Sequence, residues 1–145
     1  MAKTRTITAT HDGVTFKRQT HRNYSHVIIG LPDAEAVLRA YRESAEQDIR
    51  RSWSYYTKIV DGTYQYMEYV TEDSKAEAAK LVSLGLDGAI KLRMERSEEL
   101  AKKRIARGWE SLAWAGRPDL AAKQVDEWKK PIHCLGQVLA IPVDA

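Results

Sequence analysis

The spacing of the apolar residues changes near Pro32, and this change limits the folds that the chain can adopt. Before Pro32, short segments rich in β-branched residues predict strands at Thr4–Thr10, Val14–Arg18 and Ser25–Ile29. After Pro32, apolar residues recur every three or four positions, as they do on one face of an α-helix. The sequence therefore predicts an α+β fold that begins with strands.

Two residues with turn-forming chemistry separate the first two of these segments. Asp12-Gly13 favours the positive φ angles of a tight hairpin turn, because glycine has no Cβ and aspartate tolerates the left-handed region. We therefore expect the first two strands to form a β-hairpin. The polar stretch Gln19–Tyr24 leads to the third strand, which Gly30 and Pro32 are expected to end.

A long helix is predicted after the third strand. Pro32 or Asp33 opens it, and Asp61-Gly62 ends it. Its apolar residues share one face, which we expect to pack on the sheet while the charged residues face water. These apolar residues are Val37, Leu38, Tyr41, Ala45, Ile49, Trp53, Tyr56 and Val60.

The middle of the chain is predicted to hold a fourth strand and a second long helix. Thr63–Val70 alternates in polarity and is rich in tyrosine, which is typical of a strand. Ser74, with Glu77 three residues later, matches a capping box and predicts that a helix begins there. Gly85 interrupts this helix, and an amphipathic stripe then continues to near Gly108.

The C-terminal part predicts a short helix and a last strand. Pro118 precedes helical spacing over Leu120–Trp128, and Pro131 ends it. Leu135–Val143 is apolar on both alternations, which is typical of a strand inside a sheet rather than at its edge. The predicted fold is α+β: a small antiparallel sheet, with the N-terminal hairpin, further strands and the C-terminal strand, packed with two long helices and one short helix.

Length and composition exclude several classes of protein. The chain has 145 residues, enough for a single domain over residues 1–145 without disulfide or metal staples. Its one cysteine, Cys134, excludes an internal disulfide bond and a multi-cysteine zinc site. Because the sequence has no apolar run of about 18 residues and no secretory signal, we expect a cytoplasmic protein with no membrane segment.

Positive charge is concentrated near the N-terminus. The whole chain has a net charge of +3, and residues 1–31 carry five Lys or Arg residues and one Asp, a net +4. The remaining residues therefore carry −1. This asymmetry predicts an anionic partner near the N-terminal elements, either nucleic acid or a small molecule.

The densest group of polar side chains lies in Phe16–His26, between two predicted strands. Arg18 and Arg22 are the leading candidates for binding phosphate, because a guanidinium donates two parallel hydrogen bonds to two oxygens. Tyr24 and His26 complete the predicted ligand-binding residues of this segment. In the alternative interpretation the segment is a solvated loop, its arginines pair with acids of the first helix, and His26 is a structural histidine.

A second candidate group lies in the predicted turn Gly108–Leu120. Trp109 and Trp114 could stack on a nucleobase, and Arg117 could hold a phosphate. In the alternative interpretation both indoles fill the core. Asp119 is then an acid in the first turn of a helix, where it favours the helix dipole.

Catalytic and metal-binding motifs are missing from the sequence. It contains no glycine-rich phosphate loop and no HExxH, GxSxG or paired HxT motif, and its four histidines lack metal-ligand spacing. We therefore predict no metal, no cofactor and no catalytic residue. An enzyme that degrades its ligand stays open as an alternative, with His26 or His133 as acid or base.

Two segments resemble motifs of small bacteriophage proteins. Phe16–Ile28 resembles an F-x-R-x-T-x-R-x-Y-T-H-V-V opening, and Trp114–Ala121 resembles a second signature of the same group. The chain is thus similar to the first type of anti-Thoeris protein, a phage sponge that sequesters the cyclic ADP-ribose signal of bacterial TIR-domain immune enzymes. The resemblance implies a homo-oligomer in the infected cell that holds its ligand intact. The positions carried over from the pattern are Arg18, Arg22, Tyr24 and Arg117.

The leading hypothesis is therefore a binding protein that sequesters a small phosphate-bearing nucleotide without cleaving it. Such a protein needs a preorganised pocket and no general base. The main alternative is a module that binds nucleic acid or a host protein, of the anti-restriction or anti-CRISPR type. That module would use the same basic surface as an extended stripe, with steep salt dependence.

Overall fold

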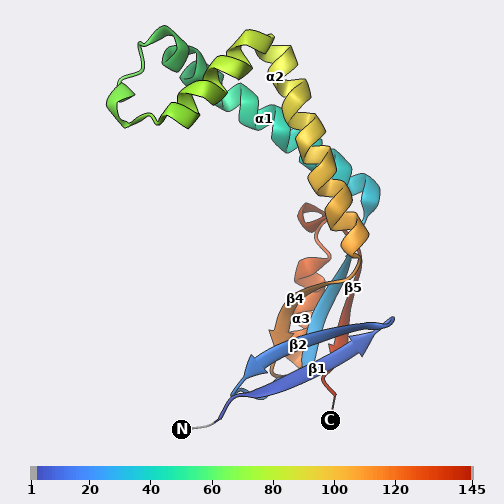
Figure 1. The fold of residues 1–145 in the computed structure, drawn as a ribbon. Coiled ribbons are helices and arrows are strands. Elements are labelled where there is room, and N and C mark those ends of the chain that lie inside the picture. Colours follow the sequence, from blue (N-terminus) through green and yellow to red (C-terminus); the bar gives the residue numbers. More distant parts are fainter. Residues whose placement is uncertain (1–2, 145) are drawn as a thin grey trace. The chain divides into compact units, whose positions relative to one another are not determined.

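The computed structural model describes residues 3–144 and confirms the α+β class (Figure 1). Its strands pair antiparallel in two small sheets, the hairpin β1-β2 and the three-stranded sheet β4-β3-β5. The elements are β1 (Arg5–His11), β2 (Val14–Thr20), β3 (His26–Pro32), α1 (Ala34–Asp61), the 3₁₀ turn η1 (Met67–Tyr69), α2 (Glu72–Arg107), β4 (Glu110–Ala115), α3 (Pro118–Trp128), the 3₁₀ turn η2 (Pro131–His133) and β5 (Leu135–Pro142).

The contacts divide the chain into two compact units. The first unit joins residues from both ends of the chain, 1–37 and 103–145, and holds both sheets and α3. The second unit is Leu38–Lys102 and consists of most of α1 and α2 with the segment that links them. The single domain expected from chain length stays a prediction.

The first unit is built in three layers around β3. Side chains alternate along a strand, so Val27 and Ile29 face one way and Ile28 the other. Val27 and Ile29 pack with Ala9 and Phe16 of the hairpin. Ile28 packs on the opposite side, in a cluster that includes residues of α3. The hairpin and α3 therefore cover opposite faces of the sheet, as Figure 1 shows.

The hairpin and the short helix agree with their predictions. β1 and β2 pair along their whole length, and Asp12 and Gly13 have φ angles of 52° and 76°. Positive φ at both turn residues is what a two-residue type I′ hairpin requires. Helix α3 begins at Pro118, whose missing N–H costs nothing in the first turn of a helix.

The predicted place of the C-terminal strand inside the sheet is wrong. β5 pairs with β3 alone and lies at the edge of the sheet, whereas β3 is central. Leu139 and Ile141 pack on the hairpin side, and Val138 and Ala140 pack on the α3 side. The strand is apolar on both alternations because both faces of the sheet are covered, and this pattern does not indicate its position in the strand order.

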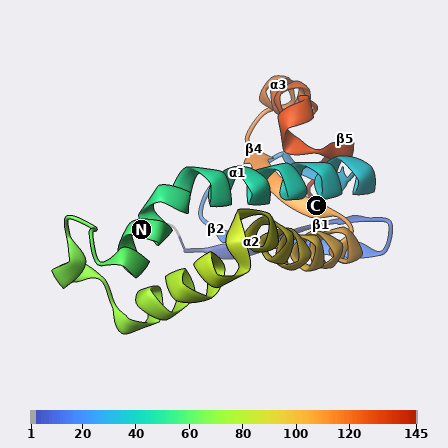
Figure 2. The same cartoon turned by 90° about the horizontal axis from the view of Figure 1, so that it is seen from above.

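In the second unit, α1 and α2 lie side by side (Figure 2). The prediction that the apolar face of α1 packs on the sheet is wrong, because Ile49 of this face packs with Leu81, Ala89 and Ile90 of α2. Trp53 and Tyr56 of the same face border this cluster. Two long helices with apolar stripes can bury those stripes against each other without a sheet.

Helix α2 has an interruption that the sequence indicated. Gly85 has φ 77° and ψ 170°, far from helical values, so two helical segments meet there. An exposed ion pair joins the second segment to α1, from Arg42 to Glu98. The hydrogen bond from Arg42, and then its charge, lowers the pKa of the Glu98 carboxyl below its ordinary value.

The strand predicted at Thr63–Val70 does not exist; the segment contains the 3₁₀ turn η1. The backbone N–H groups of Thr63 and Tyr64 donate to the Lys58 carbonyl, which ends α1 rather than starting a sheet. The Tyr64 ring lies 5.0 Å from Tyr55 and 5.9 Å from Tyr66, centroid to centroid. Two of the tyrosines that suggested a strand, Tyr64 and Tyr66, therefore make edge-to-face ring contacts in a helix connection.

The N-terminus of α2 also differs from its prediction. The helix begins at Glu72, and Thr71 is its N-cap residue: the Ser74 N–H donates to Thr71 Oγ1 at 3.1 Å. Glu77 does not complete a capping box, because its carboxylate pairs with Arg93 at 3.5 Å. The predicted box at Ser74 is therefore wrong by one helical turn.

We expect Thr71→Ala to destabilise the protein by about 1 kcal/mol, because it removes the N-cap acceptor of α2. Ser74→Ala keeps that acceptor, so its cost should stay within a few tenths of a kcal/mol. Urea unfolding followed by circular dichroism at 222 nm measures both. A larger loss for Ser74→Ala than for Thr71→Ala would contradict this assignment of the cap.

Candidate functional site

The two segments with predicted site residues meet at one end of the three-stranded sheet. β3 and β4 run antiparallel, so the start of β3 lies beside the end of β4. The Ser25 N–H donates to the Ala115 carbonyl at 2.9 Å, just before β3 begins. A Cβ placed on Gly116 would lie 3.5 Å from the Asn23 carbonyl oxygen. The loop after β2 and the residues after β4 are therefore in contact.

Three of the predicted residues contact one another in a row at this end of the sheet. The Arg18 guanidinium carbon lies 4.9 Å from the centroid of the Tyr24 ring, a cation–π distance. The Tyr24 ring lies 6.2 Å from the Trp114 ring at an interplanar angle of 56°. We call Arg18, Tyr24 and Trp114 the cationic–aromatic cluster. Arg18 is exposed and the two rings are half-buried, so the cluster opens to solvent.

The hairpin register explains why Arg18 reaches Tyr24. Arg18 pairs with Ile7 across the hairpin and shares a strand face with Phe16, and both neighbours are buried. Arg18 therefore lies on the face of the hairpin that packs on the sheet. The aliphatic part of its side chain can cover apolar surface there, and its guanidinium can extend to the Tyr24 ring. Arg5 joins the same loop, because its Nη2 donates to Asn23 Oδ1 at 2.6 Å.

Two further predicted arginines lie on the chain segments that meet here. Arg22 is exposed in the loop, where its backbone N–H donates to Thr20 Oγ1 at 3.0 Å. Arg117 occupies the N-cap position of α3, and its side chain is 68% exposed. Within residues 3–144 its guanidinium pairs with Asp119 at 3.5 Å, and the Asp119 side chain is also exposed. An anion from solvent can therefore compete for the guanidinium.

The second candidate segment, Gly108–Leu120, contains a strand where a turn was predicted. β4 spans Glu110–Ala115, and it carries a β-bulge: Ile28 pairs with Ala113 and Ile29 with Ser111, which leaves Leu112 unpaired. In a regular strand, residues five apart face opposite sides. The extra residue reverses this parity, so Trp109 and Trp114 both pack on the hairpin side.

Trp109 nevertheless lies at the other end of β4 from the cluster. Its ring contacts His11 at 5.0 Å, edge to face, near the hairpin turn. Trp109 and Trp114 thus contact opposite ends of the hairpin and do not enclose one ligand together. Trp109 therefore fits the alternative interpretation, in which the indoles fill the core.

His26 lies on the opposite face of the sheet from the cluster. His26 faces the same side as Ile28, which packs on the α3 side of the sheet. It also pairs with Ala115, which packs with Ile28 on that side. Its Nδ1 is 2.8 Å from Ser25 Oγ, whose hydroxyl donates to the Ala115 carbonyl at 3.3 Å. Strand parity therefore separates His26 from Arg18 and Trp114.

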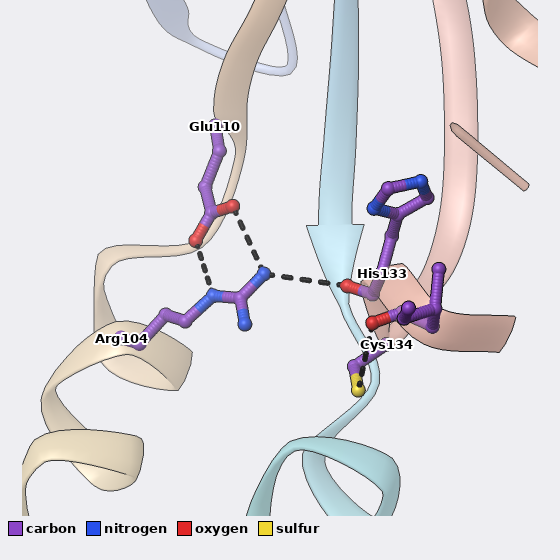
Figure 3. Close-up of polar contacts among 5 residues, drawn as sticks. Arg104, Glu110, His133 and Cys134 are labelled. Carbon is purple, nitrogen blue, oxygen red and sulfur yellow. Dashed lines mark hydrogen bonds and ion pairs between the residues drawn. The ribbon is translucent and has the colours of Figure 1, made fainter. Parts of the chain in front are cut away.

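A largely buried ion pair lies at the other end of β4, and no motif in the sequence indicated it (Figure 3). Arg104 Nε and Nη2 donate to the two Glu110 carboxylate oxygens at 2.8 and 3.3 Å. Nη2 also donates to the His133 carbonyl at 3.5 Å. The side chains are only 19% and 23% exposed. This pair fixes the last turn of α2 to β4 and to η2, which is a structural role.

Other surfaces of the described residues offer less to an anion. A shallow depression of about 320 Å³ on α3 is lined by Leu120, Lys123, Gln124 and Glu127. A hydrogen bond from Lys130 lowers the pKa of Glu127, so this depression carries a carboxylate. Residues 3–144 contain no group of three or more His, Cys, Asp or Glu side chains placed to hold a metal ion. None of their helices is long and apolar enough to cross a membrane.

Comparisons of the chain with protein-family models, curated proteins and solved structures gave no match. The geometry of the described residues therefore carries the functional argument.

We expect Arg104→Met to destabilise the protein by about 2–4 kcal/mol, because it leaves the Glu110 carboxylate mostly buried and unpaired. Glu110→Met should cost a similar amount, because it leaves the Arg104 guanidinium mostly buried and without this carboxylate. The double variant Arg104→Met/Glu110→Met should lose much less than the sum of the single variants, because no charge is left without a partner. Urea unfolding of the four proteins measures the coupling, and additive losses would contradict a paired role.

Proposed function

We propose that this protein sequesters a small phosphate-bearing nucleotide, of the cyclic nucleotide type used as an immune signal, and holds it without cleaving it. A cyclic ADP-ribose isomer is the leading ligand, and suppression of host antiviral signalling is the consequence. The cationic–aromatic cluster carries this proposal. It combines aromatic rings that can stack on a base with the Arg18 guanidinium, which can bind phosphate.

The way in which Arg18 is held supports a ligand-binding role. Arg104 donates two parallel hydrogen bonds from its N–H groups to the Glu110 carboxylate. Those N–H groups are the ones that would otherwise bind two phosphate oxygens. Arg18 instead contacts Tyr24 through a ring face. A cation–π contact orients a guanidinium and leaves its N–H edge available to phosphate oxygens.

The resemblance to the phage anti-Thoeris sponge points in the same direction. The motif positions Arg18, Arg22 and Tyr24 lie in or beside the cluster, and Arg117 follows the strand that contributes Trp114. A sponge requires binding energy and no acid–base chemistry, in keeping with the separation of His26 from the cluster. Homo-oligomerisation and a location in the infected cell are parts of the same proposal.

A nucleic-acid-binding module is the rival explanation of the basic residues. An extended basic stripe would need cations along the outer face of the hairpin. That face carries the threonines Thr6, Thr8 and Thr10 on β1, and Lys17 is its one basic residue in β1 and β2. Two arginines of β1 and β2 instead contact the short loop between β2 and β3: Arg5 donates to Asn23 and Arg18 lies against Tyr24. Contacts to one short loop suit a small ligand better than an extended nucleic acid.

The first test is to incubate the purified protein with cyclic ADP-ribose isomers and with cyclic di- and trinucleotides, and to measure binding by calorimetry. Heating the complex then releases the ligand for mass spectrometry. We expect tight binding of one class and release of unchanged ligand. Altered ligand would indicate an enzyme. Binding only of DNA or RNA, with a steep loss of affinity as salt rises, would support the rival.

We expect Arg22→Ala and Arg117→Ala each to weaken nucleotide binding by about 10- to 100-fold, the range for loss of one charge-assisted contact. Both residues are exposed, so the unfolding midpoint should not change. Arg96→Ala removes an exposed arginine of the second unit and is the matched control. Equal affinity for all four proteins would exclude Arg22 and Arg117 as contacts of the ligand.

A further inference from the structure

The link between α1 and α2 has an unusual composition, and we call residues 59–74 the acidic tip. It contains Asp61, Glu68, Glu72 and Asp73 and no Lys, Arg or His, which gives a net charge of −4. All four acids are exposed. The Glu72 side chain stays 91% exposed although it pairs with Lys75, just beyond the tip.

The acidic tip also exposes large apolar and aromatic side chains. Tyr69 is 78% exposed, Tyr66 50% and Val60 46%. Exposed aromatic groups of this kind mark interaction surfaces, and tyrosine is enriched in the contacts that dominate protein interfaces. Tyrosine also loses little conformational entropy on binding, because it has only two side-chain torsions.

Neighbouring rings hold part of this surface in place. The Tyr55 ring lies 5.6 Å from Tyr56 and 5.0 Å from Tyr64, and Tyr64 lies 5.9 Å from Tyr66. This row of rings begins on α1 and continues into the acidic tip. A preorganised surface pays less entropy on association than a mobile loop does.

The charge of the acidic tip indicates the chemistry of its partner. Two tips would repel each other, because each carries four acids and no cation. The first unit of the same chain has the opposite character, with twelve Lys and Arg residues against eight Asp and Glu residues. Its cationic–aromatic cluster contains Arg18, and the exposed Arg22 and Arg117 lie on the two chain segments that meet at that end of the sheet. Guanidinium groups bind both tyrosine rings and carboxylates.

We propose that the acidic tip of one copy docks on the cationic–aromatic cluster of a second copy. The tip would then occupy the surface to which the nucleotide is proposed to bind, so this inference rests on the proposed site. Self-association and nucleotide binding would therefore compete, and a bound nucleotide would displace the acidic tip of one copy from the cluster of the other. By linkage, self-association would lower the apparent nucleotide affinity by the same factor.

Charge reversal with complementation tests this contact. A tip-reversed variant carries Asp61→Lys and Glu68→Lys, which brings the net charge of the acidic tip from −4 to 0. A cluster-reversed variant keeps Arg18, Tyr24 and Trp114 and carries Arg22→Glu and Arg117→Glu, on the two chain segments that contribute Tyr24 and Trp114 to the cluster. Sedimentation velocity over a concentration series measures association. We expect wild-type protein to associate and each variant alone to associate at least about thirtyfold more weakly. An equimolar mixture should associate again, because the unchanged acidic tip of the cluster-reversed variant then meets the unchanged cluster of the tip-reversed variant.

The matched control reverses two exposed acids of α1 outside the acidic tip, Glu43→Lys and Asp48→Lys. It makes the same change in net charge as the tip-reversed variant, and it should associate as the wild type does. Ile132→Ser, at an apolar residue that is 82% exposed in the first unit, should also leave association unchanged. Tyr69→Ser should weaken it.

Three results would overturn the proposal: a monomeric wild type at all concentrations, a tip-reversed variant that associates as the wild type does, or a mixture that fails to reassociate. Recovery in the mixture also shows that both variants are folded. The tip-reversed variant retains the cluster, so its nucleotide affinity tests the proposed function separately. Nucleotide binding without association would reject this inference and the proposed homo-oligomer but not the nucleotide site, and association without nucleotide binding would reject the sponge alone.

Discussion

The pairing of β3 with two neighbours is the interaction on which the first unit depends. Its buried side chains alternate, so Val27 and Ile29 hold the hairpin on one face while Ile28 contacts the layer of α3 on the other. The antiparallel register of β3 with β4 also brings Tyr24, before one strand, beside Trp114, near the end of the other. These residues are 90 positions apart in the chain, and one backbone ladder makes them neighbours.

Elements fixed by local chemistry could be predicted from the sequence. Asp12-Gly13 determines the hairpin turn, and Pro118 starts α3, because each requirement is met within a few residues. Elements that depend on distant partners were predicted less well. Thr63–Val70 has strand-like composition but no strand beside it, and the apolar face of α1 could not indicate whether a sheet or α2 would cover it.

The candidate site shows the same division. Arg18, Arg22 and Tyr24 could be proposed from the sequence because they lie within one short segment, and Trp114 and Arg117 because they share another. The bulge at Leu112 could not be foreseen, and it decides that both tryptophans face the hairpin. His26 faces away from the cluster because alternate residues of a strand share a face. Which residues face the hairpin depends on the register of β3.

Two arginines of the first unit, Arg104 and Arg18, have different environments that suit different roles. Arg104 is largely buried and meets a carboxylate with its forked edge, so its hydrogen-bonding capacity is consumed in holding α2, β4 and η2 together. Arg18 is exposed and meets an aromatic face, which orients the guanidinium without neutralising its charge. A protein that only needed to anchor its hairpin could do so with an apolar side chain at this position. An oriented, charged guanidinium at the surface is better explained by an anion that arrives from solvent, whether a phosphate or the carboxylates of another copy.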